Sequence, residues 1–127
     1  MMDSILRVSP RFAPIWQNFL REWEGKGNEL PIYLVLSDLA RHIAVLSGEN
    51  AERELQEIFK IVENWHLNGD AYVKEAATVG LLEDLQNTNL VGAERPAKFI
   101  KYLGPESKRC WKKVEDIWEK GEIIRDN

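Results

Sequence analysis

The stretch Asp70-Ala-Tyr-Val-Lys-Glu-Ala-Ala-Thr-Val-Gly-Leu-Leu-Glu-Asp-Leu-Gln86 decides the fold class. Its apolar residues, which run from Tyr72 to Leu85, cover most of the circumference of a helix rather than a single stripe. A helix of this kind is normally surrounded by other helices, and Gly80 would allow one of them to cross closely. Asp70 is a suitable N-cap, because its side chain can accept a hydrogen bond from a free amide of the first turn. The stretch therefore predicts the central helix of an all-α domain.

Five further segments carry apolar residues at helical spacing, so the sequence predicts about six helices in all. The expected ranges are 11–24, 31–48, 50–67 with Asn50 as the N-cap, 96–103 and 106–120. No segment alternates with the period of a strand. Because the loops are short, consecutive helices should lie antiparallel, either in a compact bundle or as stacked αα-hairpins. We expect one domain over residues 1–127, with loose ends at about 1–8 and 122–127.

The composition excludes several classes of protein. The chain has 127 residues, of which 44% are apolar, and this supplies enough material for a core. No apolar run approaches the length of a transmembrane helix, and no secretory signal pattern is present, so we expect a cytoplasmic protein without a membrane partner. Cys110 is the only cysteine, which excludes an internal disulfide and a multi-cysteine metal site. The glycines form no phosphate-binding loop, and we expect no cofactor.

The net charge of -4 conceals an uneven distribution. Residues 49–94 hold ten acids and three bases, and residues 95–113 hold one acid and seven bases. The acidic block is explained either as ordinary solvated surface or as a docking surface for a basic partner, where complementary charge raises the association rate. On the second interpretation, the candidate contact residues are Glu52, Glu57, Glu63, Glu75, Glu83 and Asp84.

The basic block could contact phosphates, but other features argue against a nucleic-acid partner. The isoelectric point is about 5.3, and no zinc-finger, basic-zipper or RNP pattern is present. We expect Lys101, Lys108 and Lys112 to pair with the acidic helices of the same molecule instead.

Two pairs of a carboxylate and a histidine are candidates for chemistry. Glu63-x-x-His66 is half of a di-iron ligand pattern, which needs a second such pair and two more glutamates. Asp38 and His42 lie one turn apart, but no nucleophile motif accompanies them. We therefore expect a helix-surface histidine at 66, a surface ion pair at 42, and neither catalytic residues nor metal ligands. An enzyme would require these side chains to converge on one pocket.

The remaining unusual side chains are assigned to the core. All five tryptophans, at 16, 23, 65, 111 and 118, fall on apolar stripes. Trp23 and Trp118 lie near helix ends and are the candidates for exposed anchors. Cys110 lies among basic residues, which would favour a thiolate, but its position beside Trp111 favours a partly buried small hydrophobe.

Two segments together carry a resemblance to a known family. They are Tyr72-Val-Lys-Glu-Ala-Ala-Thr-Val-Gly-Leu-Leu-Glu-Asp-Leu-Gln-Asn87 and Tyr102-Leu-Gly-Pro-Glu-Ser-Lys-Arg-Cys-Trp-Lys-Lys113. They resemble a family of small, all-helical bacterial proteins of unknown function, in which a Phe usually stands at position 102 and an Arg at 108. Such proteins look like immunity proteins encoded beside polymorphic or contact-dependent toxins. The resemblance implies no catalytic residue, and Gly104-Pro105-Glu106-Ser107 reads as a helix stop followed by a new helix start.

The resemblance and the acidic block together predict a binding protein rather than an enzyme. We expect an immunity protein that neutralises a cognate toxin domain by steric and electrostatic docking, the toxin being a basic nuclease on the electrostatic interpretation. The alternative is a structural or regulatory helical module that self-associates as a homodimer through exposed apolar stripes. Salt dependence separates the two, because an apolar interface is nearly insensitive to it.

Overall fold

The computed structural model describes residues 1–24, 31–87 and 96–120, without the side chains of 96 and 118–120. Every regular element in these ranges is helical, which confirms the all-α prediction. The α-helices are α1 (Met2–Val8), α2 (Ala13–Glu22), α3 (Ile32–Gly48), α4 (Glu52–Asn68), α5 (Ala71–Glu75), α6 (Glu83–Gln86) and α8 (Pro105–Lys120). The 3-10 segments are η1 (Pro10–Phe12) and η3 (Pro96–Tyr102), and η2 (Ala76–Leu82) is a π-helix.

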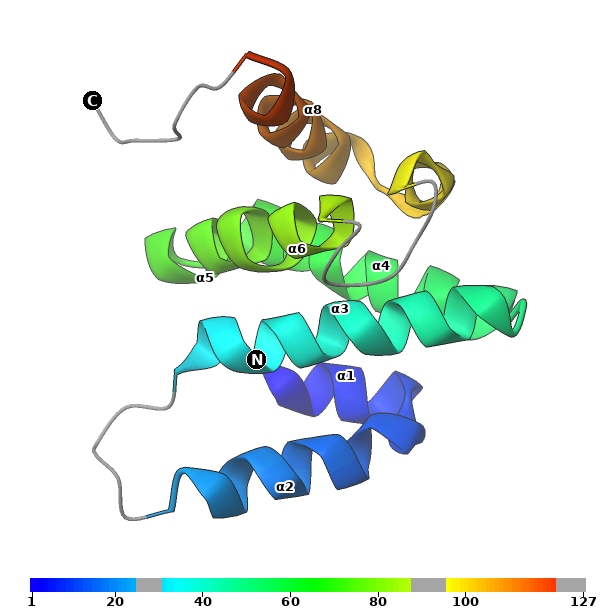
Figure 1. Ribbon diagram of the computed structural model, residues 1–127, viewed down its shortest axis with the longest axis vertical. Coiled ribbons are helices and arrows are strands. Elements are labelled where there is room, and N and C mark those ends of the chain that lie inside the picture. The colour runs from blue at the N-terminus through cyan, green and yellow to red at the C-terminus, as the bar shows by residue number, and fades with distance from the viewer. Residues whose placement is uncertain (25–30, 88–95, 121–127) are drawn as a thin grey trace.

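The helices lie in layers along the long axis of the molecule. Figure 1 shows α2 at one end and α8 at the other, with α3 and the α5–α6 unit between them. Helix α4 contacts α1 and α3 on one side and α5 and α8 on the other, so it ties the layers together. Side chains from all of these helices meet in one buried core.

The predicted central helix is confirmed as the continuous unit α5–η2–α6, with a π-helical middle that the sequence did not indicate. Its N-cap is Asp70, whose Oδ1 accepts a hydrogen bond from the amide of Val73 at 2.9 Å. A Cβ at Gly80 would lie 3.1 Å from Leu36 Cδ1 and 3.2 Å from Tyr33 Cδ1, so the glycine permits the close crossing of α3. Segments of π-helix are rare and occur often at functional sites.

The beginning of the chain differs from the prediction. Residues 1–8, which we expected to be loose, contain α1 (Met2–Val8), and Met2 and Ile5 on it are 3% and 0% exposed. The expected helix over 11–24 is divided into η1 and α2, because Pro10 starts a short 3-10 turn and the α-helix begins only at Ala13. The other expected loose end, at about 122–127, lies outside the described residues.

The start of α4 also differs from the prediction. Asn50 is not the N-cap of α4: its φ is 58°, in the left-handed region that Asn tolerates, and the helix begins at Glu52 after Ala51. The expected short helix over 96–103 is confirmed as the 3-10 segment η3.

The aromatic residues fill the core largely as predicted. Trp65 and Trp111 are buried, and Trp16 and Trp23 are half-buried against the core, whereas the side chain of Trp118 lies outside the described part. Cys110 is 8% exposed, so it is more deeply buried than the partly buried position that we expected. In the described ranges, no helix is both long and apolar enough to cross a membrane.

Candidate functional site

The carboxylate of Glu63 on α4 caps the first turn of α8. Its Oε1 accepts a hydrogen bond from the amide of Ser107 at 2.8 Å, and its Oε2 accepts one from the amide of Glu106 at 3.0 Å. The carbonyl of Gly104 accepts the first helical bond, from Lys108 at 2.9 Å, so Gly104 is the N-cap residue and has no side chain to satisfy these amides. Glu63 therefore supplies from another helix the cap that α8 lacks.

The segment Gly104-Pro105-Glu106-Ser107 is explained by this contact. A Cβ at Gly104 would lie 2.6 Å from Glu63 Cγ, so only glycine leaves room for the carboxylate. Pro105 occupies the first helical position, where an amide hydrogen has no partner inside the helix. The expected helix stop and restart is confirmed, and Glu63 is the partner that the sequence did not reveal.

His66 lies directly behind this cap and is 4% exposed, so the prediction of a surface histidine is wrong. Its Nδ1 is 2.7 Å from Ser107 Oγ, and its Nε2 is 3.1 Å from Thr78 Oγ1 in the π-helix. The Ser107 hydroxyl also bonds to the Glu63 carboxylate, which can only accept. With the Ser107 hydroxyl proton assigned to Glu63, the ring proton of His66 is assigned to Nδ1, and Nε2 then accepts from the Thr78 hydroxyl.

Burial and hydrogen bonding set the charge of both groups. Burial lowers the pKa of His66, and this outweighs the opposite effect of the nearby Glu63 and Glu106 carboxylates. For Glu63, burial would raise the pKa, but the bonds from the Ser107 and Glu106 amides outweigh it and hold the pKa below its usual value. A neutral imidazole therefore lies beside an ionised carboxylate at neutral pH.

A second cluster of the same kind joins the start of the chain to α3 and α4. The Ser9 hydroxyl donates to the Glu54 carboxylate, and Ser9 Oγ lies 2.7 Å from His42 Nε2. His42 is 8% exposed, with its ring centroid 5.4 Å from that of Phe12. Burial is the main cause that lowers the pKa of His42.

The expected surface ion pair between Asp38 and His42 is wrong. Asp38 pairs with Arg41 at 3.1 Å, and His42 turns into the core, where its carboxylate neighbour is Glu54 at 3.9 Å. Helix α3 buries residues on most of its circumference, and His42 belongs to this buried set. His42 therefore faces the core rather than water.

Both clusters follow the order carboxylate, serine, histidine. In a catalytic triad the carboxylate binds the far nitrogen of the histidine, and the serine gives its proton to the ring. Here each serine gives its proton to the carboxylate and accepts one from the ring. This differs from the order of a catalytic triad, and in both clusters the serine joins side chains from different parts of the chain. Among the described residues, no group of three His, Cys, Asp or Glu could hold a metal ion.

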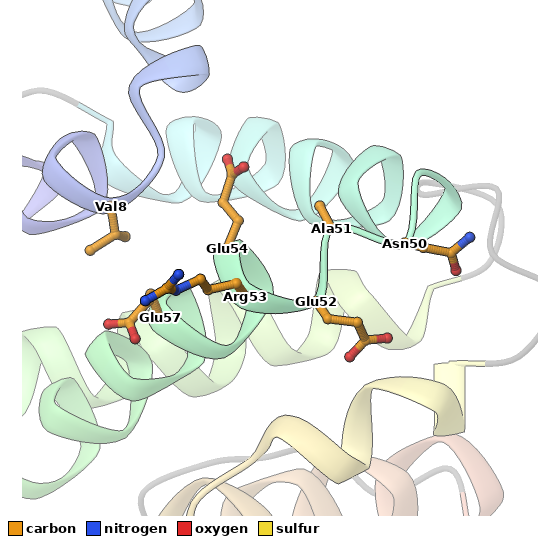
Figure 2. A pocket seen from close by; sticks show the side chains of 7 residues that line it. All are labelled: Val8, Asn50, Ala51, Glu52, Arg53, Glu54 and Glu57. Carbon is orange, nitrogen blue, oxygen red and sulfur yellow. The ribbon is translucent and has the colours of Figure 1, made fainter.

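A groove of about 620 Å³ opens at the N-terminal end of α4, and we call it the α4 groove. Figure 2 shows Glu54 and Glu52 directed to different sides of the start of α4, with Arg53 and Glu57 beside each other near Val8. The lining of the groove thus includes three carboxylates, beside the apolar Val8 and Ala51.

The outer carboxylates of the α4 groove already hold cations of the same molecule. Glu52 accepts from the Tyr102 hydroxyl at 2.7 Å and from Lys101 Nζ at 3.4 Å, and the Tyr102 bond is the main cause that lowers its pKa. Glu57 pairs with Lys60 at 3.2 Å on its own helix. Of the three expected internal pairs of the basic block, the structure has the pair from Lys101.

Lys108 and Lys112 do not pair with the acidic helices. Lys112 lies 4.0 Å from Asp116 on its own helix α8, and Lys108 has no ion pair among the described residues. Both residues are exposed on α8.

The structure does not bring the six predicted contact residues to one face. Glu52 and Glu57 line the α4 groove, and Glu63 is committed to the cap of α8. Glu75 is exposed on α5 and lines a different pocket beside His66.

Glu83 and Asp84 lie in a third place, on α6. Asp84 accepts a hydrogen bond from the Ser37 hydroxyl at 2.6 Å, which joins α6 to α3. Burial raises the pKa of both carboxyls, and Asp84 adds to the effect on Glu83. These two residues are half-buried, so they offer less charge to a partner than Glu52 and Glu57 do.

These features define a small all-α domain whose helices are joined through two buried carboxylate–serine–histidine clusters. The chain belongs to the family described as "Domain of unknown function (DUF7674)", whose model matches residues 2–119. This agrees with the resemblance to a family of unknown function. Comparisons with curated proteins and with solved structures gave no match.

Proposed function

We propose that this protein is a non-enzymatic binding protein whose α4 groove docks on a basic surface of a partner protein. The partner that we propose is a cognate toxin domain, neutralised in the bacterial cytoplasm, as the resemblance to immunity proteins implies. The observation that carries the proposal is the α4 groove itself, whose lining includes Glu52, Glu54 and Glu57.

The internal ion pairs of the groove do not stand in the way of a partner. The side chains of Glu52 and Glu57 are 50% and 44% exposed, and those of Lys101 and Lys60 are 63% and 73% exposed. Pairs this exposed contribute little to stability, because water and salt screen them. A lysine or arginine of the partner can therefore replace the internal cation at little cost.

Docking at this surface would inhibit a nuclease by occlusion. A nuclease cleft carries basic residues that bind phosphates, so an acidic surface is complementary to it in charge. Complementary charge raises the association rate and excludes wrong partners more than it adds affinity. Steric coverage of the cleft then prevents substrate binding.

The test begins with a pull-down from the native bacterium at low and moderate salt, with mass spectrometry to identify what is bound. The association rate of the recovered protein is then measured for E52K/E57K and for a control, E22K/E24K, which changes the charge equally at exposed positions of α2 and the turn after it. We expect about a tenfold slower association, with weaker salt dependence, in E52K/E57K alone. Equal rates for the two variants would refute docking at the α4 groove.

Self-association is a second candidate, and exposed apolar residues on α3 favour it. Leu34 and Val45 are 50% and 55% exposed and lie about three turns apart, so they share one face of α3. A homodimer through this face would show a concentration-dependent mass in sedimentation that salt does not change and that L34S/V45S abolishes. A monomeric mass at all concentrations would exclude it.

A further inference from the structure

A second pocket, of about 380 Å³, lies between the α5–η2 segment and the first turns of α8, and we call it the α8 pocket. It is separate from the α4 groove and shares no lining residue with it. Its most buried lining residue is His66, which is held by Ser107 and Thr78 as described above. The buried part of the pocket lining is therefore the hydrogen-bonded imidazole of His66.

Three cationic side chains line the α8 pocket. Lys74 comes from α5, and Arg109 and Lys113 come from one face of α8, one turn apart. Arg109 is oriented by Glu106, whose Oε1 accepts from Arg109 Nε at 3.0 Å. Lys74 and Lys113 form no ion pair with any described residue. Two ammonium groups from different helices are thus available at the pocket, beside a positioned guanidinium.

The acidic residues of the lining cancel this charge only in part. Glu106 pairs with Arg109, which leaves Glu75 against the two lysines, Lys74 and Lys113. Three cations against two carboxylates leave the lining with a positive excess, in a chain whose net charge is -4. A positive pocket on an acidic protein favours an anionic ligand over a cationic one.

The size of the pocket indicates more than a bare anion. A volume of about 380 Å³ lies in the range of small-molecule sites. Ala71 and Val79 provide apolar lining next to the charged groups, so one part of a ligand can be uncharged. The lining includes Thr78 of the π-helix, and such segments occur often at ligand sites.

We propose that the α8 pocket binds a small phosphorylated organic compound, with its phosphate group held by Lys74, Arg109 and Lys113 and its organic part beside Ala71 and Val79. Lysine and arginine are the side chains that hold phosphate groups in proteins, the lysine as a point charge and the arginine as a two-pronged donor. Because the site lies away from the α4 groove, this inference does not depend on the proposed docking function.

The experiment is an NMR titration of the full chain with ribose 5-phosphate as the probe and ribose as the uncharged control. We expect saturable shifts that are largest at the amides of Thr78, Arg109 and Lys113, and no shifts with ribose. The affinity should fall about tenfold or more in K74A/K113A, because two contacts to the phosphate are lost.

The matched control is K108A/K112A, which removes the same charge from exposed positions of α8 outside the pocket. We expect it to bind ribose 5-phosphate as the unmodified chain does. All four positions are exposed, so the variants should retain the helical content, which far-UV circular dichroism checks. The absence of saturable shifts, equal shifts with ribose, or equal losses in the two variants would each overturn the proposal.

Discussion

Replacing Glu63 by alanine should destabilise the protein by removing the cap of α8. Two amides of the first turn lose their acceptor, and loss of an N-cap costs about 1 kcal/mol. The negative charge at the positive end of the helix dipole contributes about 0.3 to 1 kcal/mol more. Ser107 and His66 also lose the group that orders their bonds, so we expect a total of about 2 to 3 kcal/mol in urea unfolding.

The same reasoning predicts strong coupling between Glu63 and Gly104. A Cβ at Gly104 would lie 2.6 Å from Glu63 Cγ, so Gly104→Ala should displace the carboxylate and cost about as much as losing the cap, about 1 to 2 kcal/mol. In the Glu63→Ala background there is no carboxylate to displace, and the added cost should fall to a few tenths. A double-mutant cycle measures this difference.

The control is Gly48→Ala, because a Cβ at Gly48 would meet nothing within 4 Å. This substitution should be neutral or stabilise by about 0.4 to 1 kcal/mol through the unfolded chain. The capping argument is refuted if Glu63→Ala changes the unfolding free energy by less than about 0.5 kcal/mol. It is also refuted if Gly104→Ala costs the same in both backgrounds.

Two further outcomes follow from the buried clusters. His42 and His66 have folded-state pKa values below the usual 6.5, so the unfolded chain binds protons first, and stability should fall as the pH drops below about 6.5 toward those lowered values. Urea midpoints across that pH range test this, and His66→Asn should flatten the slope. Ser9→Ala leaves His42 Nε2 and Glu54 without their shared partner and should lower the free energy of unfolding by about 1 to 3 kcal/mol. The control Ser4→Ala, on α1, should leave the free energy of unfolding nearly unchanged.

Helical spacing could be read from the sequence wherever a helix is long enough to show a stripe. The sequence predicts helices over 31–48 and 70–86 because apolar residues recur at helical spacing over several turns there, and these residues face the core. Helix α1 was missed because it has only seven residues, and two buried side chains, Met2 and Ile5, make no detectable period.

The sequence points to some members of the carboxylate–serine–histidine clusters but not to their partners. Glu63 and His66 stood out by their spacing, but their partners Ser107 and Thr78 are distant in the sequence and are common residue types. One signal was present: a helix that begins after Gly104-Pro105 has no side chain at its N-cap, so an acceptor must come from elsewhere. The π-helical segment that turns Thr78 toward His66 had no signal, because its residues also suit an α-helix.

The four glutamates of α4 fall into two pairs with different kinds of partner. Glu54 and Glu63 are bound to serines, one at the start of the chain and one at the start of α8, so α4 is fastened at two points to the rest of the fold. Glu52 and Glu57 pair with exposed lysines, and Glu52 also accepts a hydrogen bond from the half-buried Tyr102. Substitution of the first two should therefore lower the free energy of unfolding, whereas reversal of the last two should alter partner association and leave stability nearly unchanged. If E52K/E57K unfolded at a much lower urea concentration than E22K/E24K, the α4 groove would be a structural element rather than a docking surface.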